Sequence, residues 1–232
     1  MAYQIIRRKR QRLNYMFSGF FICTIISLIL NMIYFGALTD ETTILILNFW
    51  ANFFICFGPI FILIVNLIII ESTIIFSVKR QNKFILYYGI ILLIGMLIFY
   101  ILDGVRNLSP TAIGRWGVII STSGISWTPF FFIFVVSVIT SFAIIPIIIT
   151  SLKIYHSFTT DALKKKWFYY FIGSLGSFSI AYVVFVNNLI NWIKYFYFGE
   201  SPTFNLFFTL YSTTIIIWGF LMYYGIGYRL HK

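Results

Sequence analysis

Six stretches of apolar residues follow one another along the chain, and this repetition limits its fold more than any other feature. A helix needs about 20 apolar residues to cross a hydrocarbon core of roughly 30 Å. Each stretch meets that length within a few residues, so we predict spans at about 13–37, 44–78, 84–102, 126–151, 167–193 and 204–228. The sequence therefore predicts a single transmembrane domain over residues 1–232, all-α and folded as a six-helix bundle.

The composition excludes a soluble domain. Hydrophobic residues make up 60% of the chain and charged residues 10%, whereas about a quarter of the residues in soluble domains are charged. The net charge of +11 would fit a nucleic-acid-binding protein, but the basic residues lie in short runs between the apolar segments. We therefore interpret them as the excess of Lys and Arg that marks cytoplasmic loops, and we expect no nucleic acid as a partner.

The distribution of charge predicts an orientation. Fourteen of the 17 basic residues precede span 1 or follow spans 2, 4 and 6, so both termini are predicted to be cytoplasmic. The outer connection between spans 3 and 4 contains RWGVIIST and GISW, two short extended segments that flank a Ser-Gly turn. We predict a short extracytoplasmic hairpin there.

Span 2 carries polar residues along one line. At about 100° per residue from Asn48, the positions Asn52, Pro59, Asn66, Thr73 and Ser77 fall within roughly 40° of one line along the helix. Lipid cannot satisfy such side chains, so the stripe should face other helices. Pro59 should also kink the helix, because proline lacks a backbone donor and clashes with the preceding turn.

Further asparagines lie in spans 1 and 5. Asn residues can join helices through hydrogen bonds, or they can line a solvated ligand cavity, and the sequence leaves both readings open. The candidate intramembrane polar or ligand-lining residues are Asn31, Asn48, Asn52, Asn66, Asn187, Asn188 and Asn191.

Three residues are candidate switch elements. Glu71 is the one acidic residue within an apolar segment, and an intramembrane acid suggests a switch or proton site. It could equally lie at the inner interface and pair with Lys79 or Arg80. Pro59 and Pro146 are the other two, because a proline kink can let helix segments shift against one another.

The sequence offers no catalytic chemistry. No span carries a lysine near its middle, and His156 and His231 lie outside the spans. Paired carboxylates, a phosphate-binding loop and a nucleophile motif are also missing. We therefore expect no enzyme, and no cofactor or metal.

The order of features resembles the N-terminal seven-helix sensor region of membrane histidine kinases and related signalling proteins of bacteria and archaea. The matching segments are FWANFFICFGPIFILIVNLIII, GISWTPFFFIFVV and IITSLKIYHSFTTDALKKKWFYYFIGSLG. The family's first helix and its output domain have no counterpart in this sequence. The resemblance implies a sensory module in the plasma membrane of a prokaryote.

We therefore expect a receptor-like module that binds a small or lipidic ligand, or a membrane partner, and signals to a separate cytoplasmic protein. Alternatives are a non-catalytic structural subunit of a larger membrane complex and a small transporter or channel. Homo-oligomers are possible. The inner connection at 152–166 is the largest predicted cytoplasmic element, and its candidate partner surface consists of Lys153, Lys164, Lys165 and Lys166.

Overall fold

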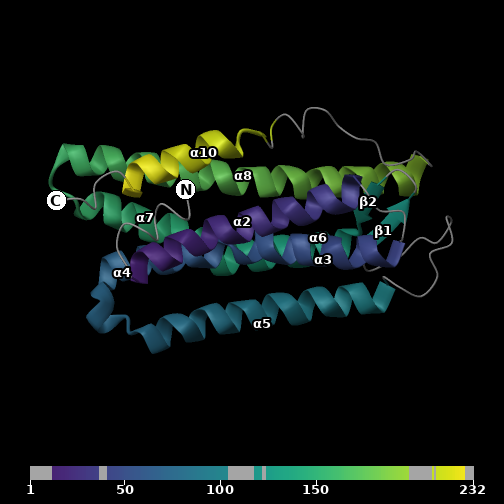
Figure 1. Ribbon diagram of the computed structural model, residues 1–232, viewed down its shortest axis with the longest axis horizontal. Helices are drawn as coiled ribbons and strands as arrows, with labels where there is room; N and C mark the ends of the chain where they lie inside the picture. The colour runs from purple at the N-terminus through teal and green to yellow at the C-terminus, as the bar shows by residue number, and fades with distance from the viewer. Residues whose placement is uncertain are drawn as a thin grey trace.

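The computed structural model describes residues 12–36, 41–103, 118–121, 124–198, 211 and 213–227. Helices that run alongside one another form most of it (Figure 1). Five are long and apolar enough to cross a membrane: Arg12–Ile33, Thr42–Glu71, Val78–Ile101, Pro129–Ser157 and Asp161–Lys194. A further apolar helix, Ile215–Ile226, is shorter. These helices indicate an integral membrane protein.

The first two spans form a packed pair. Helix α2 (Arg12–Gly36) contacts both α3 (Glu41–Phe57) and α4 (Pro59–Ile75). The sequence predicts a kink at Pro59, and the structure divides span 2 there, with Gly58 as a non-helical residue between α3 and α4. The predicted polar stripe is buried at Asn48, Asn52, Pro59 and Asn66. It ends before Ser77, which is exposed and lies beyond the end of α4; the side chain of Thr73 lies outside the described residues.

Helix α5 (Val78–Asp103) lies at one edge of the bundle (Figure 1). One narrow stripe of the helix is buried, and the positions four residues apart on it are Tyr88, Leu92, Met96 and Tyr100. The rest of its surface exposes large apolar side chains such as Leu86, Ile94 and Ile101. An apolar helix that is buried on only one stripe is what lipid contact on the other faces requires.

A two-stranded hairpin precedes span 4, at positions that the sequence predicts. Strands β1 (Val118–Ser121) and β2 (Gly124–Trp127) pair antiparallel, with Val118 opposite Trp127 and Ser121 opposite Gly124. Strand β2 leads almost directly into α6 (Pro129–Ile139), because Thr128 is the only residue between them. Proline suits the first helical turn, where a missing N–H removes no hydrogen bond.

Span 4 is irregular in its middle. Helix α6 is followed by a π-helical turn, η1 (Thr140–Ile144), and then by α7 (Ile145–Ser157). Helix α8 (Asp161–Phe198) begins only three residues after α7 ends. The prediction of an inner loop at 152–166 is therefore wrong, since residues 152–157 belong to α7 and residues 161–166 belong to α8.

The last described helix packs tightly on α8. Helix α10 (Ile215–Met222) and the π turn η2 (Tyr223–Gly227) lie along it (Figure 1). A Cβ atom at Gly173 would lie 2.6 Å from the backbone nitrogen of Met222, and one at Gly176 would lie 2.2 Å from the Trp218 ring. These two glycines form a small-residue face on α8, and α10 fills this face closely.

The basic residues gather at one end of the bundle. The connections α4–α5 and α7–α8 lie at the end opposite the hairpin (Figure 1). Lys79, Arg80 and Lys83 flank the first connection, and Lys153 and Lys164–Lys166 flank the second. At the same end, Arg12 of α2 donates hydrogen bonds to Gln81 at 3.1 Å and to Asn82. Charge is therefore segregated along the helix axes, as the sequence predicts for a membrane protein.

The close approach of α8 and α10 predicts an asymmetry between two Gly→Ala substitutions. Gly173→Ala should destabilise the detergent-solubilised protein by about 1–3 kcal/mol, because the added methyl group meets backbone atoms. Gly89→Ala serves as the control, since its Cβ would meet only the far edge of the Phe57 ring, at 3.0 Å. It should be neutral or stabilising, because alanine favours helix by roughly 0.5–1 kcal/mol. Equal losses in chemical unfolding experiments would contradict this packing.

Candidate functional site

The side-chain amide of Asn66 makes hydrogen bonds to two other helices. Its nitrogen donates to Ser151 Oγ at 2.8 Å and to Thr150 Oγ1 at 3.0 Å, and lies 3.3 Å from the carbonyl oxygen of Ile147. Its oxygen accepts from the Tyr170 hydroxyl at 3.1 Å. Asn66 is fully buried. One side chain of α4 therefore joins α7 and α8.

A second contact holds α7 and α8 together beside Asn66. The indole N–H of Trp167 donates to the backbone oxygen of Ser151 at 2.8 Å, and the Trp167 and Tyr170 rings lie 4.6 Å apart. Both aromatic side chains are buried. The end of the bundle that carries the lysines is thus fixed by a polar and aromatic cluster on three helices.

Two tyrosines attach α5 to α3. The Tyr100 hydroxyl donates to Asn48 Oδ1 at 2.6 Å, and Asn52 Nδ2 donates to the same oxygen at 2.9 Å. The Tyr88 hydroxyl donates to the backbone oxygen of Cys56 at 2.7 Å, two residues before the break at Gly58. Buried hydroxyls and amides need such partners, because an unpaired buried polar group costs roughly 1–3 kcal/mol.

The π turn in span 4 precedes Pro146. Proline cannot donate to the carbonyl four residues earlier, and its ring clashes with that carbonyl. The helix widens before it, so that the Ile145 N–H donates to the oxygen of Thr140, five residues back. The Thr140 hydroxyl is hydrogen-bonded to the Tyr182 hydroxyl of α8. The irregular segment of span 4 is thus held by a side chain of α8.

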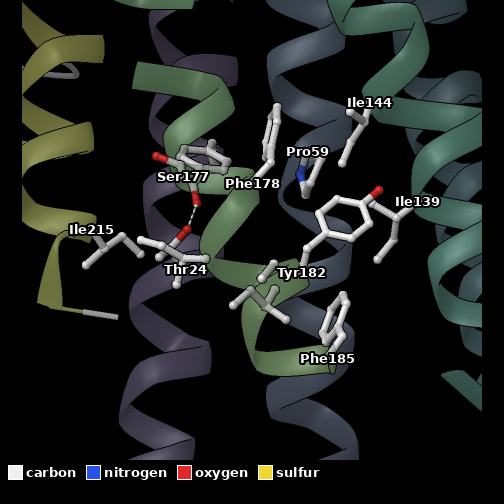
Figure 2. A pocket seen from close by; sticks show the side chains of 13 residues that line it. Thr24, Pro59, Ile139, Ile144, Ser177, Phe178, Tyr182, Phe185 and Ile215 are labelled. Carbon is white, nitrogen blue, oxygen red and sulfur yellow. Dashed lines mark hydrogen bonds between the residues drawn. The ribbon is translucent and has the colours of Figure 1, made fainter. Parts of the chain in front are cut away.

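The two helix breaks border one cavity. Pro59 lies next to the break of span 2. Across the cavity from it are Ile139, which precedes the π turn of span 4, and Ile144, the last residue of that turn (Figure 2). Tyr182 of α8 reaches between them (Figure 2). The cavity measures about 20 Å³, far below the roughly 300–1,000 Å³ of pockets that bind small molecules. None of the seven candidate asparagines lines it.

The candidate asparagines fall into separate environments. Asn31 is half-buried and donates to the backbone oxygen of Ser27 in its own helix, at 3.0 Å. Asn187 and Asn188 are half-buried, and Asn191 is buried, near the far end of α8. Asn48 and Asn52 bond within α3 and to α5, while Asn66 bonds to α7 and α8. The structure therefore does not gather the seven residues into one lining.

The candidate switch and partner residues are more exposed. Glu71 is half-buried near the end of α4, and it forms no ion pair with another described side chain. Lys153 and Lys165 are exposed, and Lys164 and Lys166 are half-buried, on α7 and α8. In the described part of the chain, no group of three or more His, Cys, Asp or Glu residues could hold a metal ion.

Sequence reasoning missed the hydroxyl groups and one amide. Tyr88, Tyr100, Tyr170 and Tyr182 supply hydrogen bonds to breaks and asparagines, but the chain holds 16 tyrosines and nothing in the sequence singles these out. Gln81 is fully buried and donates to the oxygen of Phe76 at 2.7 Å, although it lies within a basic run.

Comparisons with known proteins found no matching family model, no matching curated protein and no matching solved structure.

The Asn66 cluster predicts a large effect for one asparagine and a small one for another. Asn66→Leu should lower stability by about 2 kcal/mol, because it leaves several buried partners unpaired. Asn187→Leu is the control, since Asn187 is half-buried and has no hydrogen-bond partner among the described residues. It should be close to neutral. Unfolding in mixed detergents measures the stability of both variants. Similar losses would show that the hydrogen bonds of Asn66 are not specially stabilising.

Proposed function

We propose that the chain is a receptor-like sensory membrane module that passes a helix displacement to a separate cytoplasmic protein. The observation that carries this proposal is the convergence of two helix irregularities on one cavity and one side chain, Tyr182. Sensory helices need an element with two arrangements of similar energy. A broken span beside a span with a π turn supplies such an element, because π turns are frequent at functional sites.

The end of the bundle that carries the lysines is proposed to face the cytoplasm and the partner. The exposed lysines of α7 and α8 lie directly next to the Asn66 cluster, which joins α4, α7 and α8. A displacement of these helices would therefore move Lys153, Lys164 and Lys165 together. The proposed location is the plasma membrane of a prokaryote, and it follows from the resemblance described above.

A structural subunit of a larger membrane complex is the second candidate function. It is favoured by the cavity volume, which has no room for a ligand of ordinary size. The broad exposed apolar surface of α5 would then contact another subunit rather than lipid. In the sensory function, by contrast, the input is a membrane partner or a lipidic molecule at the outer surfaces of the helices, or a small ligand that enlarges the cavity.

The orientation is tested by cysteine labelling in intact cells. A cysteine at Thr42 should react with a membrane-impermeant thiol reagent, whereas cysteines at Asn82 and Thr160 should react only after lysis, because these exposed positions lie at opposite ends of the bundle. The parent protein gives the baseline, since Cys23 and Cys56 are buried. Labelling of Thr160→Cys but not Thr42→Cys in intact cells would reverse the orientation.

The sensory proposal predicts a cytoplasmic partner that depends on the lysines of α8. Lys164→Gln/Lys165→Gln should reduce recovery of that partner several-fold in affinity purification from native membranes. Lys79→Gln/Lys83→Gln removes the same charge from the other connection at this end, and both of its positions are exposed. This control should leave recovery unchanged.

The same purification also separates the two candidate functions. Recovery of a stoichiometric set of membrane subunits, unaffected by either lysine pair, would support the structural subunit. Provided that both variants are folded and inserted, this result would contradict the sensory proposal.

A further inference from the structure

The cavity beside Pro59 has a mostly apolar lining that also contains a few hydrogen-bond acceptors. Ile55 and Pro59 both line it, and they are four residues apart in the sequence. In a continuous helix, residue 59 would donate its N–H to the carbonyl oxygen of Ile55. Proline has no N–H, so that carbonyl lacks its helical donor.

The two small hydroxyls of the cavity have already committed their protons. Thr24 Oγ1 donates to the backbone oxygen of Phe20 at 3.0 Å, and Ser177 Oγ donates to that of Gly173 at 2.9 Å. Each oxygen keeps lone pairs that can accept further hydrogen bonds. Thr24 and Ser177 lie near each other at the side of the cavity that faces α2 (Figure 2). A small hydrogen-bond donor inside the cavity would satisfy these acceptors.

The size of the cavity fits one water molecule as the donor. Its volume of about 20 Å³ exceeds the roughly 10–15 Å³ that one water needs, and a buried water usually makes 2–4 hydrogen bonds to otherwise unsatisfied groups. Ordered waters are among the groups that satisfy the backbone at helix breaks within membranes. We propose that this cavity binds an ordered water, which donates its protons to acceptors among the Ile55 carbonyl, Thr24 Oγ1 and Ser177 Oγ.

The alternative is a dry void, because most of the lining is apolar, including Phe20, Ile139 and Phe178. Adding side-chain volume to the cavity changes the stability of the protein in opposite directions in these two cases. Filling a dry void stabilises a protein, commonly by about 0.5–2 kcal/mol. Displacing a water that satisfies buried acceptors destabilises it, because those acceptors then lose their donor.

Two variants test the proposal through melting temperature in detergent. Ala181→Val adds volume at the cavity wall, since Ala181 lines it. Thr24→Val removes an acceptor but keeps the shape of the side chain. With a bound water, each substitution should lower the melting temperature by about 2–4 °C. Ala162→Val, at an exposed position of the same helix α8, measures the cost of a β-branched residue without a cavity and is subtracted.

The double variant decides between a shared water and two unrelated losses. If both substitutions act on one water, the second should cost little once the first has expelled it, so the double variant should melt close to the worse single variant. Because Thr24→Val creates no space, it cannot relieve crowding caused by Ala181→Val. A rise in melting temperature for Ala181→Val, or fully additive losses in the double variant, would overturn the proposal.

Discussion

The structure depends on one constraint: within hydrocarbon, each backbone group must find its partner inside the protein. A continuous helix meets this requirement alone, whereas every break must borrow a donor or an acceptor from a neighbour. In span 2, Tyr88 donates to the Cys56 carbonyl two residues before the break. In span 4, the π turn pairs the Ile145 N–H with the backbone oxygen of Thr140, and Tyr182 bonds to the side-chain hydroxyl of Thr140 beside it. The two tyrosines therefore attach both irregular spans to neighbouring helices.

The same constraint explains the burial of Asn66. An amide in lipid would leave two donors and two acceptor sites unsatisfied, so it is stable only where other helices supply partners. Ser151, Thr150 and Tyr170 supply them from α7 and α8. These hydrogen bonds fix the register of α4 against α7 and α8. Apolar contacts alone would allow the helices to slide along one another. A single polar residue thus specifies the arrangement of three helices.

The sequence was sufficient for what periodicity and length determine. Five of the six predicted spans, the hairpin and the buried stripe through Asn48, Asn52 and Asn66 follow from local spacing, and the structure has them. The partners of Asn48 and Asn66 on other helices lie roughly 50 to 100 residues away in the sequence, which no local pattern encodes. The helical start at 161–166 lies outside the predicted spans because its lysines interrupt the apolar pattern, although Leu, Ala and Lys are all strong helix formers. Pro146 indicates an irregular helix, but its spacing does not predict that the irregularity is a π turn or that Tyr182 bonds to Thr140 there.

Helix α8 is one element that connects the two ends of the bundle. It is continuous over 38 residues, whereas spans 2 and 4 are each divided near their middle. Toward the hairpin, Phe185 of α8 packs on Trp127, with ring centroids 4.9 Å apart, and toward the lysines Tyr170 bonds to Asn66. Between these contacts lies Tyr182, beside the cavity and the π turn. In the proposed sensory function, a shift of the hairpin end would reach the lysine end along this continuous helix, while the divided spans would absorb the change at their breaks.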